Sequence, residues 1–202
     1  MSAESLILAC LVAPLVGGGL IVATGSKPNL RETMTLLTAC VLFYFVASIV
    51  PLVAVGERPS ITLLQMLPGL TIAFKIEPLG MVFACVASFL WIVTTIYAIG
   101  YMRGHHEVNQ TRFYFYFAIA ISSAMGIAFA GNMMTLFIFY EVLTLSTFPL
   151  VTHHGTEESK KAGRVYLGIL IGTSVGFLLF AIVWTYALTG TLDFTEGGIL
   201  AG

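Results

Sequence analysis

Long apolar stretches separated by short clusters of charge dominate the pattern of this sequence. Residues 5–26, 33–56, 78–102 and 165–192 contain no Asp, Glu, Lys or Arg, and residues 113–156 contain only Glu141. A helix of about 20 apolar residues crosses a hydrocarbon core of roughly 30 Å. Gly131-Asn132 is a turn signal that divides the longest stretch in two. The sequence therefore predicts a single transmembrane domain over residues 1–202, an all-α fold with six helices at about 5–25, 33–55, 78–101, 113–130, 133–152 and 165–189.

The segment between the second and third predicted spans has a different period. Apolar residues alternate with others on both sides of Pro68-Gly69, at Ile61, Leu63 and Leu67 and again at Leu70, Ile72, Phe74 and Ile76. A period of two around a Pro-Gly turn is typical of a small β-hairpin, although a short amphipathic helix fits the same residues loosely. Glu77-Pro78 then opens the third span with an acidic residue at the cap position and proline at the first helical position.

Composition supports a membrane protein, because 58% of the residues are hydrophobic and only 9% are charged. A soluble domain carries about 25% charged residues, so lipid must cover most of this surface. The net charge of −1 gives no indication of nucleic-acid binding. Cys10, Cys40 and Cys85 lie in apolar runs without metal-type spacing, and we expect buried thiols. No cofactor or metal motif is evident, although Arg103-Gly-His-His-Glu107 contains residue types that bind metals.

The orientation in the membrane follows from the positions of lysine and arginine. Seven of the nine basic residues fall in the loops that follow the first, third and fifth spans. Only Arg58 and Lys75 lie on the other side. Short loops rich in Lys and Arg face the cytoplasm. We therefore expect a multi-pass protein of the cell inner (plasma) membrane, with both termini and the hairpin on the outer face. The N-terminus is acidic, unlike a secretory signal, so the first apolar run is retained as a span.

Glu141 is the most informative residue because it lies about eight residues into the fifth span, roughly 12 Å along its axis. A charged residue at the centre of a span costs about 2.5 to 3.5 kcal/mol, and such residues usually face the bundle interior and mark ion or proton paths. A neighbouring cation would favour the ionised form and its removal the protonated form. We therefore predict that Glu141 carries protons, the alternative being a protonated carboxyl in one interhelical hydrogen bond.

Other polar residues of the fifth span are candidates for a proton path. Pro149 removes the helical partner of the Leu145 carbonyl, and Thr144 lies beside this gap, which predicts either a hydrated pocket or an ordinary proline kink. His153 and His154 end the span and are candidates for proton entry or simple polar flanking residues. Three further basic residues are topology signals or charge partners of the carboxyl, namely Lys160, Lys161 and Arg164.

Two runs of sequence resemble the proton-translocating antiporter-like subunits, and most closely the D subunit of Mrp-type monovalent cation/proton antiporters. They are Phe139-Tyr-Glu141-Val-Leu-Thr-Leu-Ser-Thr-Phe-Pro149-Leu-Val-Thr-His153 and Glu158-Ser-Lys-Lys-Ala-Gly-Arg-Val-Tyr166-Leu. The Glu-Pro-Leu that opens the third span and the final Gly190-Thr-Leu-Asp-Phe fit the same family, as does the hairpin. Related subunits occur in complex I and in membrane-bound hydrogenases.

The resemblance implies that Glu141 matches an essential glutamate that pairs with a lysine in a seventh helix. It also implies that these residues are the N-terminal part of a longer or split subunit. The expected partners are lipid and other membrane subunits, including a segment that supplies the lysine helix. The expected cargo is protons with Na⁺ or K⁺, and no cofactor is expected. Two alternatives stay open: a proton-pumping subunit of a complex-I-like NADH-quinone oxidoreductase or hydrogenase, and a non-transporting scaffold subunit.

Overall fold

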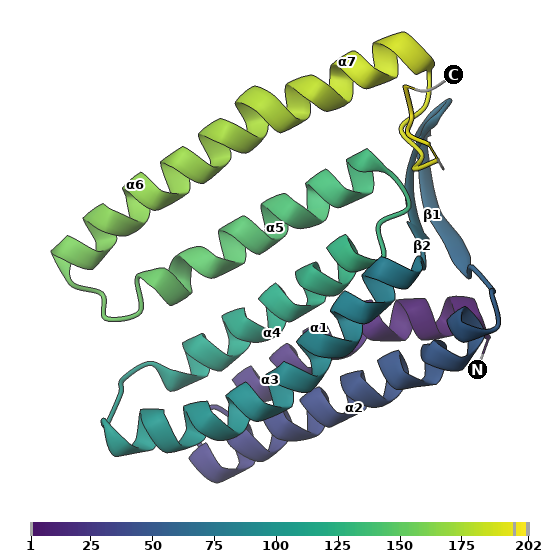
Figure 1. The fold of residues 1–202 in the computed structure, drawn as a ribbon. Coiled ribbons are helices and arrows are strands. Elements are labelled where there is room, and N and C mark those ends of the chain that lie inside the picture. The colour runs from purple at the N-terminus through teal and green to yellow at the C-terminus, as the bar shows by residue number, and fades with distance from the viewer. Residues whose placement is uncertain (1, 196, 201–202) are drawn as a thin grey trace.

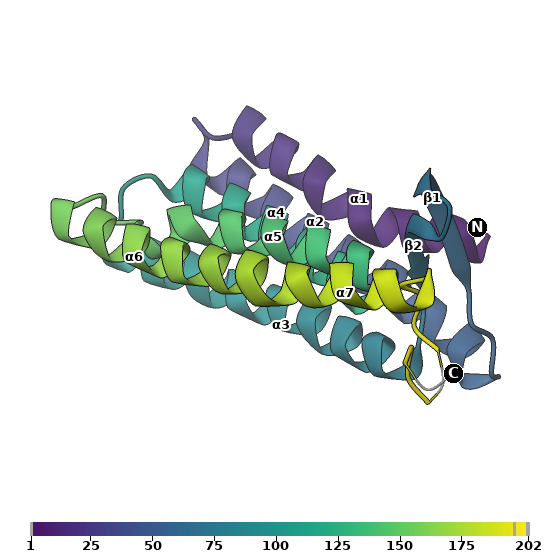
Figure 2. The same cartoon turned by 90° about the horizontal axis from the view of Figure 1, so that it is seen from above.

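The computed structural model describes residues 2–195 and 197–200. Long helices run along a common direction, and a two-stranded sheet stands across one end of them (Figures 1 and 2). In chain order the elements are α1 (Ala3–Ala23), α2 (Pro28–Ala54), β1 (Ser60–Leu67), β2 (Leu70–Lys75), α3 (Pro78–Gly104), α4 (Gln110–Ala128), α5 (Met133–Val151), α6 (Glu157–Thr173), the π-helix η1 (Ser174–Leu179) and α7 (Phe180–Thr189).

Five helices of the described chain are long and apolar enough to cross a membrane: α1, α2, α3, α5 and the continuous helix Glu157–Thr189, which comprises α6, η1 and α7. The predicted fourth span, residues 113–130, forms the 19-residue helix α4, which does not meet this standard. Its first turn carries Gln110 and Arg112, and Ser122 and Ser123 interrupt its apolar run. Figure 1 shows α4 running beside α5. Five spans are thus supported, and a membrane crossing by α4 stays a prediction.

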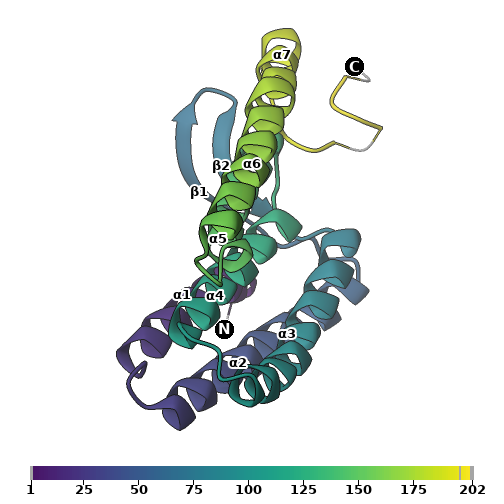
Figure 3. The ribbon, with the colours of Figure 1, turned by 90° about the vertical axis from the view of Figure 1, so that its left-hand side faces the viewer.

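Helices α1 to α4 enclose the main core, with Trp91 and Tyr114 almost fully buried. Ser122 of α4 donates a 2.7 Å hydrogen bond to the Leu11 carbonyl of α1. Seen end-on, α5 lies on one side of this group and the continuous helix of α6, η1 and α7 lies beyond α5 (Figure 3). The continuous helix Glu157–Thr189 is mostly exposed, because among the other helices it packs mainly against α5.

The three cysteines are free thiols in different environments. Cys10 is buried in α1 and Cys85 is partly buried in α3. Cys40 is exposed on α2, so the expectation of a buried thiol is wrong at this position. The reason is the rotation of α2, which presents this side chain to the outer surface of the helix group. An apolar run shows that a helix lies in lipid but does not show which side chains face lipid.

The predicted hairpin is present, with β1 and β2 antiparallel and Gly69 in the turn at φ +75°. Its second strand pairs with the loop between α4 and α5, with an antiparallel bridge between Phe74 and Ala130. The Lys75 N–H donates to the Phe129 carbonyl over 2.8 Å, and the Gly131 N–H donates to the Ala73 carbonyl over 2.9 Å. The loop therefore satisfies the free edge of β2 and attaches the hairpin to the ends of two helices.

The chain after α7 closes the same end of the molecule. Asn132 donates from Nδ2 to the Thr71 carbonyl over 3.0 Å, and it forms a β-bridge with Asp193. The Tyr186 hydroxyl donates to the Pro68 carbonyl over 2.7 Å. The hairpin, the start of α5 and the end of α7 are thus held together by hydrogen bonds. The expected cap of α3 differs: Glu77 makes no cap hydrogen bond and instead pairs with Lys75 over 2.7 Å.

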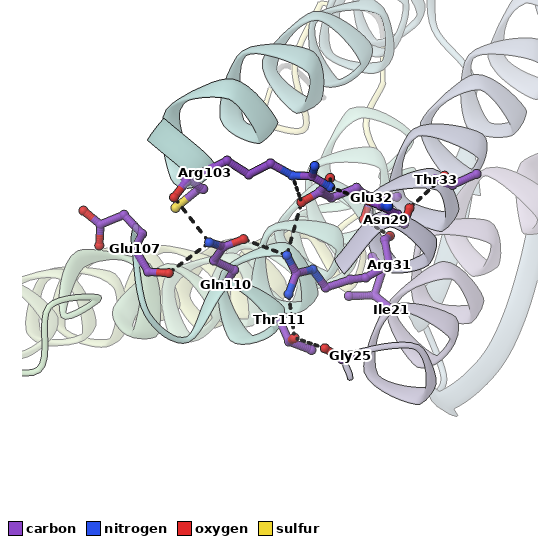
Figure 4. A network of polar contacts seen from close by, with 12 residues as sticks. Ile21, Gly25, Asn29, Arg31, Glu32, Thr33, Arg103, Glu107, Gln110 and Thr111 are labelled. Carbon is purple, nitrogen blue, oxygen red and sulfur yellow. Dashed lines mark hydrogen bonds and ion pairs between the residues drawn. The ribbon is translucent and has the colours of Figure 1, made fainter. Parts of the chain in front are cut away.

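A buried ion-pair network joins α2, α3 and α4 at the opposite end (Figure 4). Arg31 and Glu32 are only 5% and 4% exposed. Arg103 of α3 binds both carboxylate oxygens of Glu32. The Arg31 guanidinium donates to Gln110 Oε1 over 2.7 Å and to Thr111 Oγ1 over 3.2 Å. Each buried charge has an opposite charge beside it, as burial requires.

The hairpin and both ends of the described chain lie at one end of the helices, and the basic loops lie at the other (Figure 1). The relative arrangement of these parts agrees with the predicted topology. Which end faces the cytoplasm, and hence the outward position of the hairpin, stays a prediction.

Substitution of Glu32 tests the ion-pair network. Glu32→Gln leaves the buried Arg31 with neutral partners, so we expect a loss of about 3 to 5 kcal/mol in the free energy of unfolding. Unfolding of the detergent-solubilised chain, followed by circular dichroism, measures this change. Glu157→Gln is the control, because Glu157 is 85% exposed in its pair with Lys160. Equal stability of the two variants would contradict a structural role for the network.

Two glycines test the contact between α4 and α5. A Cβ at Gly126 would lie 2.1 Å from Cδ1 of Phe139, so Gly126→Ala forces the ring to move. We expect a loss of about 1 to 3 kcal/mol in unfolding free energy. Gly168→Ala is the matched control, since nothing lies within 4 Å of its Cβ position in α6. Alanine is favoured there by about 0.5 to 1 kcal/mol, so this variant should unfold at the same or a higher denaturant concentration.

Candidate functional site

Glu141 lies in the middle of α5, whose start is fixed by a side-chain cap. Asn132 Oδ1 accepts from the Thr135 N–H over 2.8 Å, which satisfies one free donor of the first turn. Glu141 is partly buried, and its Oε1 atom is buried without a hydrogen-bond partner among the described residues. No ion pair to Glu141 is found in this part of the chain. A buried carboxyl oxygen without a partner is costly, so this site is incomplete by itself.

Hydroxyl groups lie close to Glu141 along the same helix. Thr144 and Ser146 are 5% and 4% exposed. The Ser146 hydroxyl donates to the Leu143 carbonyl over 2.8 Å, which leaves its lone pairs available to accept. Pro149 is accommodated within the continuous helix α5, and Leu145 on the same face is 52% exposed. The hydrated pocket expected at this point stays a prediction.

The basic residues after α5 do not approach Glu141. Lys160 forms an exposed ion pair with Glu157 over 2.9 Å. Lys161 and Arg164 are exposed near the start of α6. These residues lie at the end of α6 that follows the α5–α6 loop, whereas the carboxyl lies mid-helix. Within the described chain they are not charge partners of Glu141.

His153 and His154 occupy different environments at the end of α5. His153 is 9% exposed, and neither ring nitrogen has a hydrogen-bond partner among the described residues. Its Nε2 lies 3.7 Å from Glu107 Oε2, and the same oxygen lies 3.9 Å from Nδ1 of the exposed His154. Burial lowers the pKa of His153, and the charge of Glu107 opposes this shift. The structure thus brings both histidines to one carboxylate.

Sequence reasoning missed Glu32 and named Glu107 only as part of a loop with metal-binding residue types. Glu32 directly follows Arg31 at the start of a span. The two adjacent opposite charges could have predicted an ion pair at this end of the helix. Glu107 is separated from His153 by 46 positions, and no periodicity predicts that contact. In the described part of the chain, no group of three or more His, Cys, Asp or Glu residues is arranged to hold a metal ion.

The site consists of one carboxyl with hydroxyl side chains beside it on the same helix. Glu141 is a titratable side chain in an apolar helix, and its charge state depends on what lies next to it. A cation brought close would favour the carboxylate, and its withdrawal would favour the acid. This dependence is the basis of a switchable proton carrier.

Two family models match this chain. Residues 130–199 match a model described as NADH:quinone oxidoreductase/Mrp antiporter, TM. Residues 68–114 match a model described as NADH-ubiquinone oxidoreductase (complex I), chain 5 N-terminus. The first match includes all of α5 and the continuous helix after it, and therefore Glu141.

Curated relatives include both antiporter and oxidoreductase subunits. Antiporter subunit mnhA2 of Staphylococcus aureus is 25% identical over 149 residues, which are 69% of this chain and 18% of that protein. NADH-quinone oxidoreductase subunit N of Desulforudis audaxviator is 27% identical over 134 residues, which are 66% of this chain and 26% of that protein. The chain thus spans about a quarter or less of the length of these relatives.

Solved structures share the fold. The Mrp complex from Dietzia sp. DQ12-45-1b contains a chain that superposes with a TM-score of 0.79 at 21% identity, covering 96% of this chain and 36% of that one. The membrane-bound sulfane sulfur reductase, an archaeal respiratory membrane complex, gives 0.76 at 21% identity, covering 92% and 28%. Both likenesses concern the fold alone.

The apolar helices and these matches define a multi-pass membrane protein of the ion-transport class. The chain is similar to the antiporter-like membrane subunits that Mrp antiporters and NADH:quinone oxidoreductases share. The resemblance to an Mrp-type antiporter-like subunit is thereby confirmed. The finer assignment to the D subunit stays a prediction, since the relatives include an mnhA2 subunit.

Proposed function

We propose that this chain is the proton-carrying N-terminal part of an antiporter-like subunit in a multisubunit monovalent cation/proton antiporter. Glu141 is the proton carrier. The observation that carries this proposal is the buried Oε1 atom of Glu141, which has no partner in the described chain. Intramembrane ionisable residues are rare, and most mark ion or proton paths. A purely structural carboxyl would be expected to hold a hydrogen bond to a neighbouring helix.

A charge partner for Glu141 must come from outside these residues. The described basic side chains lie at the ends of the helices, in the ion-pair network or in exposed loops. A lysine on a further helix of the complete subunit would supply a cation within the membrane. Its approach and withdrawal would bind and release the proton on Glu141, in exchange for Na⁺ or K⁺ moving elsewhere in the complex.

The outer face of the last helix supports a place for such a segment. Gly168, Gly172 and Gly176 recur at i+4, and nothing lies within 4 Å of a Cβ built at any of them. Small residues at this spacing allow another helix to approach closely. Further membrane helices of the same complex would cover this face. Thr144 would contribute a hydroxyl to the proton path beside the carboxyl.

A second candidate is a proton-pumping subunit of a redox-driven complex. It is favoured by the 27% identity to an NADH-quinone oxidoreductase subunit N and by the fold likeness to a respiratory reductase. The same glutamate would then carry protons in response to distant electron transfer. Addition of Na⁺ or K⁺ to vesicles that hold the complete complex separates the two, because only an antiporter releases protons in response to the cation without an electron donor.

Substitution of Glu141 tests proton carriage. In inverted vesicles that contain the complete complex, Glu141→Gln keeps the side-chain shape but cannot titrate. We expect proton translocation to fall by roughly 100-fold or more, the range over which a positioned proton donor or acceptor speeds proton transfer. Quenching of a pH-sensitive dye measures the rate. Glu141→Asp should retain part of it, since the carboxyl remains.

Glu158→Gln is the matched control, because this carboxyl is exposed at the start of α6. It should leave the rate unchanged. Equal amounts of assembled complex in the membrane must accompany each measurement. Full transport by Glu141→Gln would favour a non-transporting scaffold role and overturn the proposal.

A further inference from the structure

A cluster of Glu107, His153 and His154 lies where the loop between α3 and α4 meets the end of α5. The carboxylate lies within ion-pair distance of both rings, with Glu107 Oε2 at 3.7 Å from His153 Nε2 and at 3.9 Å from His154 Nδ1. The side chain of Glu107 is 16% exposed, that of His153 is 11% exposed and that of His154 is 70% exposed. The exposure of the three side chains therefore decreases from His154 to Glu107 and His153.

The cluster borders an open polar depression of about 940 Å³ at the ends of α2, α3 and α4. Glu107 and Gln110 line this depression, and the Gln110 amide donates to the Glu107 carbonyl over 2.9 Å. Lys27 and Arg103 also line it, so cations lie on the aqueous side of Glu107.

His153 is held in place without using its ring nitrogens. Its carbonyl accepts from Arg112 Nη2 over 2.8 Å, and its ring packs edge-on against Phe113 with centroids 5.8 Å apart. Both ring nitrogens are buried without a hydrogen-bond partner in the described chain. A buried polar side chain whose backbone is anchored while its ring stays unpaired calls for a functional explanation.

The charged groups around His153 act in opposite directions. Burial lowers its pKa, the Glu107 carboxylate raises it, and the charges of Arg112 and His154 lower it again. From α6, the neighbouring Gly163 packs against Thr152 and contributes no charge. The lowered pKa favours release of a proton from the His153 ring. The charge of the nearby Glu107 carboxylate favours binding of a proton to the same ring.

Two hydroxyl residues, Thr144 and Thr152, lie on the side of α5 that carries Glu141. Glu141, Thr144 and Thr152 follow one another at i, i+3 and i+11, which places them on one side of the helix. Thr144 and Thr152 are 5% and 8% exposed. The Thr152 hydroxyl donates to the Phe148 carbonyl over 2.9 Å, so its lone pairs can accept from water. His153 lies roughly 18 Å from Glu141 along the axis.

We propose that Glu107 and His153 form the proton-entry relay of this chain, with His154 as its exposed collector. A proton from water binds the neutral His154 ring. It passes to the Glu107 carboxylate, which becomes a carboxylic acid, and then to the neutral His153 ring. The imidazolium so formed releases the proton of its other ring nitrogen, Nδ1, to water beside Thr152, and His153 returns to a neutral tautomer. No electron is transferred. This inference rests on the proposed function, because it supplies protons to Glu141.

The test measures proton-coupled transport by the complete complex in inverted vesicles, with the pH varied on the face that carries the basic loops. Glu107→Gln removes the group that raises the pKa of His153. The high-pH limb of the profile should therefore move to lower pH, and the rate should also fall because Gln cannot carry the proton. Glu107→Asp keeps the charge and should keep the original profile. His153→Gln should reduce the rate at high pH by roughly 10-fold to 100-fold.

His105→Gln is the matched control, because His105 is exposed in the same loop and stacks on Tyr101 instead of the cluster. Its pH profile should not change. An unchanged profile for Glu107→Gln, with transport still lost in Glu141→Gln, would overturn the relay and leave the proposed function standing. Unchanged transport in Glu141→Gln would instead overturn the proposed function. A lower rate in Glu107→Gln with no movement of the high-pH limb, as a purely structural defect would give, also contradicts the relay.

Discussion

The need to satisfy polar groups away from water governs this structure. Lipid offers no hydrogen bonds, so each buried donor, acceptor or charge requires a partner within the protein. At the basic end, Arg31 and Glu32 are paired and further bonded to Gln110, Thr111 and Arg103. At the hairpin end, backbone hydrogen bonds occupy the edge of β2. The carboxyl of Glu141 is an exception, because its Oε1 atom has no partner within the described chain.

The contacts at the two ends of α5 fix the position of the Glu141 carboxyl along the helix axis. Asn132 caps α5 and binds the hairpin, and the Arg112 contact to the His153 carbonyl holds the other end of the same helix. Both ends of α5 are thus attached to neighbouring elements. A carboxyl held at a fixed depth can respond to a moving charge, whereas a carboxyl on a loosely held helix would move away from it. The structural connections at the two ends therefore serve the site between them.

The sequence predicted the features that depend on local pattern. Charge-free runs located the helices, a period of two around Pro68-Gly69 located the hairpin, and Pro78 marked the start of α3. Features that depend on helix rotation and packing could not be predicted in the same way. The exposure of Cys40 and the contact between Glu107 and His153 are examples. An apolar run is nearly uniform around its circumference, so it carries little information about which face meets a neighbour.

The continuous helix after α5 contains a π-helical segment at a similar depth to Glu141. Gly163 packs against Thr152, and the two helices run in opposite directions from that contact. Ser174 in one helix and Glu141 in the other then each lie roughly 16 Å along the axis from it. Ser174 is 4% exposed and begins the π-helix η1. Short π-helical segments occur often at functional sites because they disturb the regular backbone hydrogen bonds. The π-helical segment and the unpaired carboxyl thus lie at a similar depth, and η1 disturbs the regular backbone hydrogen bonds there.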